Sequence, residues 1–552
     1  MITETGGRHR PYRIKKGKRA EMMKHIKDIN IAETRKKIRR PLIRLIFSRI
    51  GVIGIILLLQ ALILLSVFKW MGDYSKAFME ACTAFSVVVI VWIINSRMSS
   101  SYKLSWAIIV AALPVMGTLL YLYTHFNIGA NLAFHRVRAA VDDTYAYQKT
   151  SIPVRDSIRR EDPDFAKIAD YMEKGGRAPA FNNTEVKYYP LGDDIFPVMV
   201  EELEKAESFI FMEYFIVEEG VFWDTILEIL AKKVEEGVEV RFMYDDMGSI
   251  GTLPRNYVKI LESLGISAMS FATVRPFLST YYNNRDHRKI TVIDGKTVFS
   301  GGYNLADEYI NKTERFGHWK DNAFMMKGDA VRSYTMMFLQ MWQANSVHGG
   351  KENFSRYLDI DSGRAPDPEK DGYVIPYGDG PHQVSNVAEN AYMDVINNAV
   401  RHIAVMTPYF IPDNELLHAI KHAARSGIEV SIIVPGIPDK KIINILTKSY
   451  YHELLKAGIR IYEYTPGFVH SKLMVADDEI AVMGTVNMDY RSLYLHYECG
   501  SIVYKNEAVQ QAESDINNTL EKCREVTLET TGTRNFLFWT FASVLRVFAP
   551  LL

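Results

Sequence analysis

Cysteine is scarce in this sequence and is never paired. The 552 residues contain three cysteines, Cys82, Cys499 and Cys523, and none of them belongs to a CxxC motif. An odd number of scattered cysteines excludes a disulfide framework and a cysteine-based zinc site. With 48% hydrophobic residues, the chain is nevertheless long enough to build two or more hydrophobic cores.

Spacings that would bind a metal ion are also missing. His418 and His422 lie four residues apart on a predicted helix, but the Ala-Ile-Lys between them lacks the glutamate of a His-Glu-x-x-His zinc helix. His402 and His452 have no evident partner, so structural or surface roles are favoured for all four histidines. The sequence therefore predicts no metal ion and no other cofactor.

Net charge is absent as well, because 65 Lys and Arg residues balance 65 Asp and Glu residues, but the charge is unevenly distributed. Residues 1–49 carry sixteen Lys and Arg against four Asp and Glu. Such a basic arm can bind nucleic acid or an anionic membrane, and its position before a hydrophobic segment favours the membrane. The alternative is a solvated tail that only fixes the topology. We expect the arm to stay in the cytoplasm, because Lys and Arg beside a span resist translocation.

Three apolar stretches follow the basic arm, at residues 50–68, 77–95 and 104–123. Each approaches the roughly 20 residues needed to cross a bilayer. Aromatic side chains lie where interfacial residues belong, at Trp70, Trp92, Tyr121 and Tyr123. Residues 50–123 are therefore expected to form two or three transmembrane helices, with a buried or re-entrant helix as the alternative for one stretch, chiefly the first. A cleaved signal peptide is not expected, since the first stretch starts too far from Met1 and is too long.

One short pattern occurs twice in the rest of the sequence. In both copies Lys follows His by two residues and Asp follows by seven, and such matched spacing rarely arises by chance. The first copy comprises His287, Lys289, Asp294, Gly301, Gly302 and Asn304, and the second comprises His470, Lys472, Asp477, Gly484, Thr485 and Asn487.

Each copy lies on an apolar run bounded by a turn, which predicts a buried strand. Side chains on a strand alternate between faces, so each His shares a face with its Lys, while Asp294 and Asp477 point to the opposite face. These aspartates are expected to be structural, in a buried ion pair or a turn. A histidine can act as a nucleophile or an acid/base near neutral pH, and a lysine supplies a compact cation for a phosphate oxygen. The pattern therefore predicts a site that binds and attacks phosphate without a metal.

With these motifs the chain resembles the phospholipase D superfamily, whose hallmark is a pair of His-x-Lys-x4-Asp motifs, each followed by Gly-Gly/Ser/Thr-x-Asn. The resemblance covers roughly residues 185–525. Within the superfamily the chain is similar to bacterial cardiolipin synthases. Further signals shared with them are the apolar N-terminal stretches, residues 407–412 (Thr-Pro-Tyr-Phe-Ile-Pro), residues 484–492 and the apolar C-terminus that ends with residues 549–552.

The resemblance implies a role for each motif residue. His287 would attack phosphorus to form a phosphohistidine, and His470 would protonate the leaving alcohol and then deprotonate the incoming one. Asp321 and Glu498 would orient the imidazoles, and the sequence leaves open which acid pairs with which histidine. Phosphate oxygens would be bound by Lys289, Lys472, Asn304, Asn487 and Thr485. Gly302 stands where a Ser or Thr is often found, so a hydroxyl contact is expected from Thr485 alone.

The region that carries the motifs is an internal duplication. The Tyr-Phe-Ile at 214–216 matches that at 409–411, and 237–244 matches 427–434. In each half, alternating strands and helices predict an α/β sandwich, and the two motif strands would meet at a pseudo-twofold axis. The predicted organisation is a basic cytoplasmic arm (1–49), transmembrane helices (50–123), a connector (124–184), a first half (185–348), a linker (349–381), a second half (382–525) and an apolar segment (526–552). The last segment would associate with the membrane as an interfacial helix or dock on the protein core.

The implied function is that of a membrane-bound cardiolipin synthase, which joins two phosphatidylglycerols to give cardiolipin and glycerol. The alternatives are a hydrolytic phospholipase D or another phosphodiesterase and, from a different class, a membrane scaffold with a vestigial site. Expected partners are phosphatidylglycerol and other membrane lipids rather than nucleic acid, and the oligomeric state is left open. Three crossings from a cytoplasmic arm would place the catalytic halves outside the cell, although Arg136 and Arg138 after the third stretch favour the opposite side.

Overall fold

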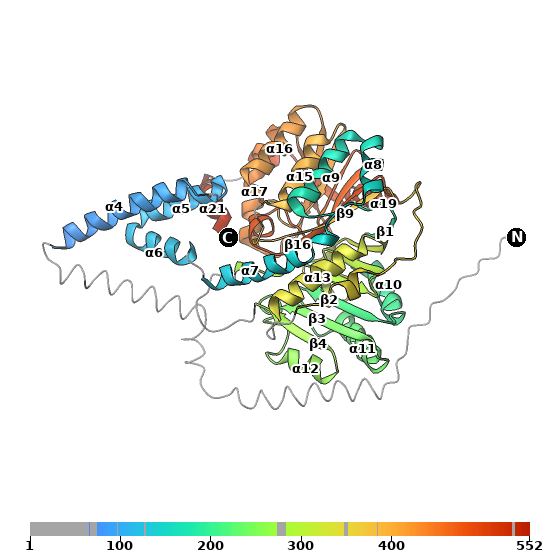
Figure 1. Ribbon diagram of the computed structural model, residues 1–552. Helices are drawn as coiled ribbons and strands as arrows, with labels where there is room; N and C mark the ends of the chain where they lie inside the picture. Colours follow the sequence, from blue (N-terminus) through green and yellow to red (C-terminus); the bar gives the residue numbers. More distant parts are fainter. Residues whose placement is uncertain are drawn as a thin grey trace.

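The computed structural model describes residues 74–96, 98–125, 128–272, 283–346, 351–383, 385–532 and 536–551, together with Ser66. The predicted basic arm and nearly all of the first apolar stretch lie outside the described residues. A block of three helices, α4 (Tyr74–Ile94), α5 (Ser100–Ala112) and α6 (Pro114–His125), extends from one side of a larger α/β body (Figure 1).

Two mixed sheets form the centre of the α/β body. The first comprises β1 (Thr184–Tyr189), β2 (Phe209–Tyr214), β3 (Glu239–Asp245), β4 (Ser267–Phe271), β5 (Ile290–Ile293), β6 (Thr297–Gly301) and β8 (Ala323–Gly328). The second comprises β9 (Tyr373–Asp379), β10 (His402–Met406), β11 (Glu429–Pro435), β12 (Arg460–Tyr464), β14 (Leu473–Ala476), β15 (Ile480–Gly484), β16 (Glu498–Tyr504) and β17 (Cys523–Val526).

The strand order of the sheets confirms the internal duplication. The first sheet runs β1-β8-β6-β5-β2-β3-β4, and the second runs β9-β16-β15-β14-β10-β11-β12 with β17 added at its edge. In each sheet three consecutive strands are parallel, namely β2–β4 and β10–β12, whereas the motif strands β5 and β14 join the neighbouring strands antiparallel. The two halves are therefore topological copies.

Helices cover the outer face of each sheet. The outer helices of the first half are α10 (Gly192–Glu204), α11 (Val221–Glu235) and α12 (Tyr257–Ser263), and those of the second are α15 (Val387–Asn398), α16 (Asn414–Arg425) and α17 (Lys441–Lys456). The helices α13 (Val331–Asn345) and α19 (Glu507–Leu520) contribute instead to a central hydrophobic cluster, which also contains side chains from both sheets. In that cluster Val292 and Phe324 of the first half belong to the same core as Val475 of the second. The halves consequently share one interior.

The predicted linker, residues 349–381, is too long. Strand β9 lies within it and pairs with β16 along its whole length, from Glu498 opposite Asp379 to Tyr504 opposite Tyr373. Before it, α14 (Ser355–Leu358) buries Tyr357 and Leu358. The Pro- and Gly-rich composition indicated a loop, but the alternating apolar residues of 373–379 complete the second sheet. This boundary is corrected to residue 372.

The predicted connector, residues 124–184, is a packed structural layer. It holds α7 (Ile128–Asp143), η1 (Tyr145–Tyr147), α8 (Ile152–Glu161) and α9 (Pro163–Gly176). On α9, Met172 is fully buried, and the Phe165 ring stacks on Tyr504 of β16 with centroids 4.0 Å apart. Although α8 and α9 precede the first half in sequence, they belong to the core of the second.

The apolar N-terminal region departs from three continuous spans. Within the described residues, α4 (Tyr74–Ile94) is the one helix long and apolar enough to cross a membrane. The third predicted span, 104–123, is divided at Leu113 into α5 (Ser100–Ala112) and α6 (Pro114–His125). Pro114 lacks a backbone N–H and disfavours helical geometry at the preceding residue, so the helix ends there. The third predicted stretch is therefore not one continuous helix.

The apolar C-terminal segment, 526–552, docks on one side and is exposed on the other. After α20 (Leu528–Gly532) it forms α21 (Phe536–Phe548) and η4 (Ala549–Leu551). Arg546 forms an ion pair of 3.1 Å with Glu453 on α17, while Phe536 and Leu537 are 81% and 73% exposed. The segment therefore contacts the protein core through Arg546, while association of its exposed apolar face with a membrane stays a prediction.

Candidate active site

The two motifs approach each other through backbone pairing between the halves. The short strands β7 (His318–Lys320) and β13 (Gly467–Val469) pair in parallel, and an isolated parallel bridge joins Asp286 to Tyr497. At these two places the amide of His470 donates to the carbonyl of Lys320 at 2.6 Å, and the amide of His287 donates to the carbonyl of Tyr497 at 2.9 Å. Each motif histidine is thus fixed beside the residue that precedes an acid of the other half.

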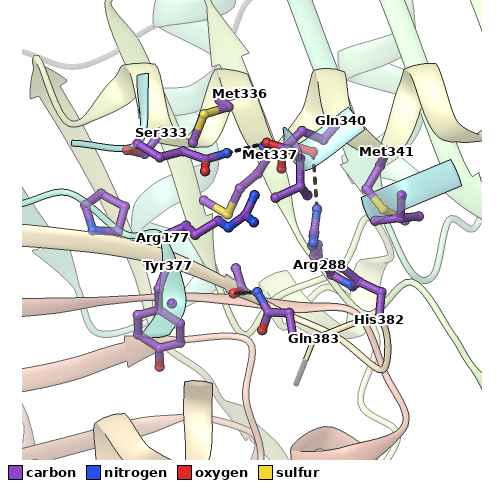
Figure 2. A pocket seen from close by; sticks show the side chains of 16 residues that line it. Arg177, Arg288, Ser333, Met336, Met337, Gln340, Met341, Tyr377, His382 and Gln383 are labelled. Atoms are coloured by element: carbon purple, nitrogen blue, oxygen red, sulfur yellow. Dashed lines mark hydrogen bonds between the residues drawn. The ribbon is translucent and has the colours of Figure 1, made fainter. Parts of the chain in front are cut away.

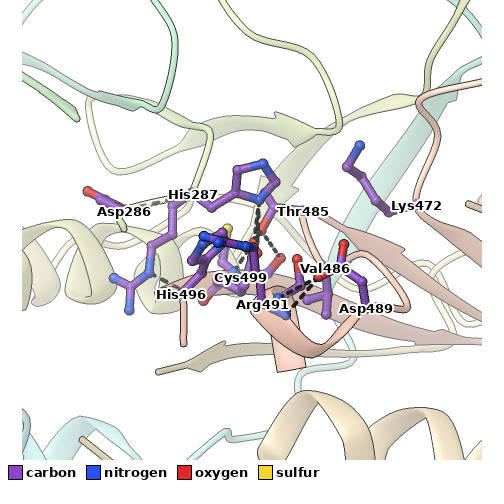
Figure 3. Close-up of polar contacts among 12 residues, drawn as sticks. Asp286, His287, Lys472, Thr485, Val486, Asp489, Arg491, His496 and Cys499 are labelled. Carbon is purple, nitrogen blue, oxygen red and sulfur yellow. Dashed lines mark hydrogen bonds and ion pairs between the residues drawn. The ribbon is translucent and has the colours of Figure 1, made fainter. Parts of the chain in front are cut away.

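Each histidine is hydrogen-bonded to that acid. Nδ1 of His287 lies 2.9 and 3.0 Å from the two carboxylate oxygens of Glu498, and Nδ1 of His470 lies 2.7 Å from Oδ2 of Asp321. The pairing left open by the sequence is therefore crossed between the halves. A carboxylate at Nδ1 holds the proton there and leaves Nε2 as the nitrogen with a free lone pair. Figure 3 shows the polar cluster around His287.

Burial controls the charge of the pairs. It lowers the pKa of His287 to about 3 and of His470 to about 4, although the carboxylate partner of each opposes the shift. Burial would raise the pKa of Glu498 and Asp321, but the adjacent histidine lowers the pKa of each carboxyl below its usual value. At neutral pH the imidazoles are neutral and the carboxylates ionised, which suits nucleophilic attack by Nε2.

The two lysines add buried positive charge. Burial lowers the pKa of Lys289 to about 8 and of Lys472 to about 7. Each ammonium donates to the carbonyl of its own motif histidine, and neither forms an ion pair with any described residue. A phosphodiester anion bound between the histidines would supply the missing negative charge.

The amides and hydroxyl predicted to bind phosphate are not equivalent. Asn304 accepts from the amide of Ile216 at 3.0 Å and donates to the Tyr309 hydroxyl at 2.8 Å, so its amide is engaged. Oδ1 of Asn487 is buried with no partner among the described residues. The Thr485 hydroxyl donates to the Glu498 carboxylate, and its contact with phosphate stays a prediction.

Gly302 has a steric reason that the sequence did not show. A Cβ at this position would lie 2.0 Å from Oδ1 of Asp321. Aspartate is shorter than glutamate, so the acid of the first half reaches its histidine only where the neighbouring side chain is absent. In the second half the longer Glu498 leaves space for Thr485, whose hydroxyl donates to the Glu498 carboxylate.

Asp294 and Asp477 lie outside the site, at the ends of β5 and β14. Each adopts a left-handed conformation, with φ of 53° and 57°, and caps three backbone amides at distances of 2.7–3.0 Å. For Asp294 these are the amides that lead into β2, at Glu207, Ser208 and Phe209. The partners are peptide groups of a turn rather than a buried cation.

His496 was missed by the sequence reasoning. Its ring centroid lies 5.6 Å from that of His287, and its Nδ1 lies 3.8 Å from Oε1 of Glu498. Its position two residues before Glu498, in His-Tyr-Glu, was the available signal. His287, His496 and Glu498 are close enough together to hold a metal ion, but Nδ1 of His287 already bonds the carboxylate.

Arg288 points away from these groups, as the alternation of side chains predicts. Its guanidinium lies in a separate pocket between α7, α13 and β9 (Figure 2). There it donates to the carbonyls of Met337 at 3.2 Å and Glu498 at 3.3 Å, so it supports the Glu498 backbone from behind.

Comparisons with known proteins agree with this geometry. A family model described as "Cardiolipin synthase, PLD-like domain" matches residues 199–342 and 392–520, and one described as "Phospholipase D-nuclease N-terminal" matches residues 84–123. A cardiolipin synthase of Alkalihalophilus pseudofirmus is 34% identical over 92% of this chain and 100% of its own length. The chain belongs to the cardiolipin synthase family.

Further relatives of this cardiolipin synthase family member extend the comparison. An uncharacterised protein of Streptococcus mutans is 43% identical over 84% of this chain and 99% of its own length. The solved structure of a phosphatidylserine synthase from Haemophilus influenzae covers 66% of this chain and 93% of its own, with a TM-score of 0.51 and 15% identity, and shows the shared fold. Family membership makes the chain a phosphatidyltransferase rather than a scaffold.

Proposed function

We propose that the enzyme transfers a phosphatidyl group from one phosphatidylglycerol to another, giving cardiolipin and glycerol. The observation that carries this proposal is the crossed pair of histidine–carboxylate hydrogen bonds, flanked by two buried lysines. That arrangement provides one nucleophile, one acid/base and positive charge for the phosphate oxygens around a single phosphorus.

In the first step Nε2 of His287 forms a bond to phosphorus while the bond from phosphorus to the glycerol oxygen breaks. His470 gives that oxygen a proton, and glycerol leaves. In the second step His470 takes the proton from a hydroxyl of the second phosphatidylglycerol, whose oxygen replaces His287 on phosphorus. The choice of His287 follows the order of roles in the superfamily, since burial shifts the pKa of both histidines in the same direction.

The charge on phosphate also explains how a histidine with a depressed pKa can act as an acid. A bound phosphodiester puts negative charge against both imidazoles, which raises the pKa of His470 towards neutrality. Lys289 and Lys472 stabilise the oxygens as charge develops in the transition state. We therefore propose that the chemistry needs no metal.

The membrane part of the proposal rests on α4 and on the exposed apolar face of α21. We propose an integral, multi-pass membrane enzyme that draws phosphatidylglycerol from the bilayer. The predicted outward placement of the catalytic halves requires three crossings, and it stays a prediction, because α5 and α6 are two short helices rather than one continuous span.

The test is lipid analysis of the purified enzyme with phosphatidylglycerol as sole lipid, dispersed in detergent and with excess chelator. Cardiolipin and glycerol in equal amounts support the proposal. Phosphatidic acid as the main product would establish the hydrolytic alternative, in which water replaces the second lipid. Loss of turnover in chelator, restored by a divalent ion, would contradict the metal-free mechanism.

A further inference from the structure

The helices α5 and α6 form an antiparallel hairpin rather than a bent rod. The ring of Trp106, early in α5, lies 5.5 Å from the ring of Tyr121, late in α6. Nearer the turn, a Cβ on Gly117 would lie 2.4 Å from the carbonyl oxygen of Ile109, so the two helices touch through their backbones. The chain therefore reverses direction at Leu113 and returns along its own path.

The hairpin runs beside the second half of α4 and stops near its middle. Its returning end lies level with the end of α4, because the ring of His125 is 4.7 Å from that of Trp92. Its tip lies near Ser86, whose hydroxyl donates to the carbonyl of Pro114 at 2.8 Å and lies 3.0 Å from the Thr118 hydroxyl. At 13 and 12 residues, α5 and α6 are about 20 Å long, short of the roughly 30 Å hydrocarbon core.

The tip also meets the requirement for broken helix inside a bilayer. A helix that ends in hydrocarbon leaves carbonyls without partners, which is tolerated only where protein supplies the hydrogen bonds. Ser86 supplies one to Pro114 at this break. The outward-facing side chains of the hairpin remain apolar, since Leu104, Leu113 and Leu119 are more than half exposed.

We propose that α5 and α6 enter the bilayer as a re-entrant hairpin, so that α4 is the last crossing and the catalytic halves lie on the cytoplasmic face. This inference does not depend on the acceptor of the phosphatidyl group. It concerns the surface through which the chain meets the membrane and the side on which the active site works.

Charge along the sequence supports the cytoplasmic side. In the topology predicted from the sequence, the basic arm stays inside, the 19 uncharged residues of 50–68 lead out, and α4 leads back. Arg97, which precedes α5, and Lys103, in the first turn of α5, then lie on the cytoplasmic side, and so do Arg136 and Arg138 after the hairpin. With three full crossings, Arg97 and Lys103 would lie on the opposite side of the membrane from Arg136 and Arg138. The hairpin instead places all four on the cytoplasmic side with the basic arm.

The same geometry brings the active site to the membrane surface. Tyr102, at the start of α5, packs edge to face against Tyr490 and Tyr494 of α18 (Tyr490–Tyr494), with centroids 6.0 and 5.8 Å away. That short helix lies between Asn487 and Glu498 of the second motif. Beside it, the Ser105 hydroxyl donates to the carbonyl of Val547, which holds the end of α21 at the same level. The base of the hairpin therefore adjoins the loop that carries active-site residues.

The test is cysteine labelling of the full-length chain in its membrane with an impermeant maleimide. Cys82 and Cys523 are changed to Ser, whereas Cys499 is kept because it is fully buried. Single cysteines are then introduced as Ser100→Cys before the hairpin and His135→Cys after it, both at exposed positions. Cardiolipin formation by each variant serves as the folding control.

Both cysteines are expected to react in inverted vesicles and to stay unmodified in intact cells. Reaction of one from each side would overturn the hairpin, because α5 and α6 would then cross the membrane. Reaction of both in intact cells would overturn the cytoplasmic assignment. A third variant, Leu113→Cys at the tip, should react from neither side until detergent is added, and its labelling in intact cells would contradict a tip buried in the bilayer.

Discussion

His287 and His470 occupy equivalent places, but a two-step displacement gives them different tasks. Replacing either with Ala removes the nucleophile or the acid/base, so we expect kcat/KM to fall by about 10³-fold or more. Phosphohistidine hydrolyses in acid, so the covalent adduct is trapped by denaturation at alkaline pH. Peptide mapping should then place it on His287. His418→Ala on the outer face of α16 is the matched control. Activity within about tenfold of wild type for either site variant would contradict the roles.

We expect the buried ammonium of Lys472 to lower the free energy of unfolding and yet to be necessary for turnover. Its pKa falls from 10.5 to about 7, so between those values the unfolded chain binds more protons and stability rises with pH. Lys472→Met should therefore lose phosphate binding while its melting temperature stays at or above that of wild type. The advantage of the variant should shrink as the pH rises from 7 to 10, measured by thermal unfolding in both proteins. A variant markedly less stable at pH 7 would show that the charge is compensated.

Asp294 should matter for folding rather than for turnover. Its carboxylate accepts three amide hydrogen bonds, and Asn would turn a donor towards one of them, at a cost of about 1–3 kcal/mol. Asp477→Asn, at the equivalent turn, should show the same loss. Thermal unfolding and kcat are measured together. Unchanged stability with lost turnover would place Asp294 in the chemistry after all.

At the scale of elements, the sequence predicted what local pattern encodes. The motif strands were expected from apolar runs between turns, and β5 and β14 occupy those runs. Pairings between distant segments carried no such signal. β7 and β13 are three residues each, too short for a period, yet they direct His470 to Asp321. The packing of α9 on the second half was missed for the same reason, because an amphipathic helix does not name its partner.

The packing of α9 can be tested at Phe165. This ring is 3% exposed and stacks on Tyr504, the last residue of β16 in the second sheet. Phe165→Ala should lower the free energy of unfolding by about 3–5 kcal/mol through lost burial and a residual cavity. Phe165→Leu keeps most of the apolar volume and should lose less. If Phe165→Ala unfolded like wild type in denaturant, α8 and α9 would be a detachable connector.

At the scale of the whole molecule, the duplication has become indivisible. The halves share the central core, and each motif histidine bonds a carboxylate of the other half. An isolated half would keep a histidine and a lysine but lose the acid that fixes the tautomer of its imidazole. We therefore expect an isolated half to be inactive.

Indivisibility predicts the outcome of mixing inactive chains. When His287→Ala and His470→Ala variants are co-expressed, every chain still lacks one histidine of its own site, because both histidines of a site come from one chain. Cardiolipin formation should then stay within the background of either variant alone, whereas wild type mixed with a doubly substituted chain should retain activity in proportion to the wild-type chains. Recovery in the first mixture would mean that chains exchange halves, with β7 of one chain pairing with β13 of another. The crossed bonds from His287 to Glu498 and from His470 to Asp321 would then form between chains.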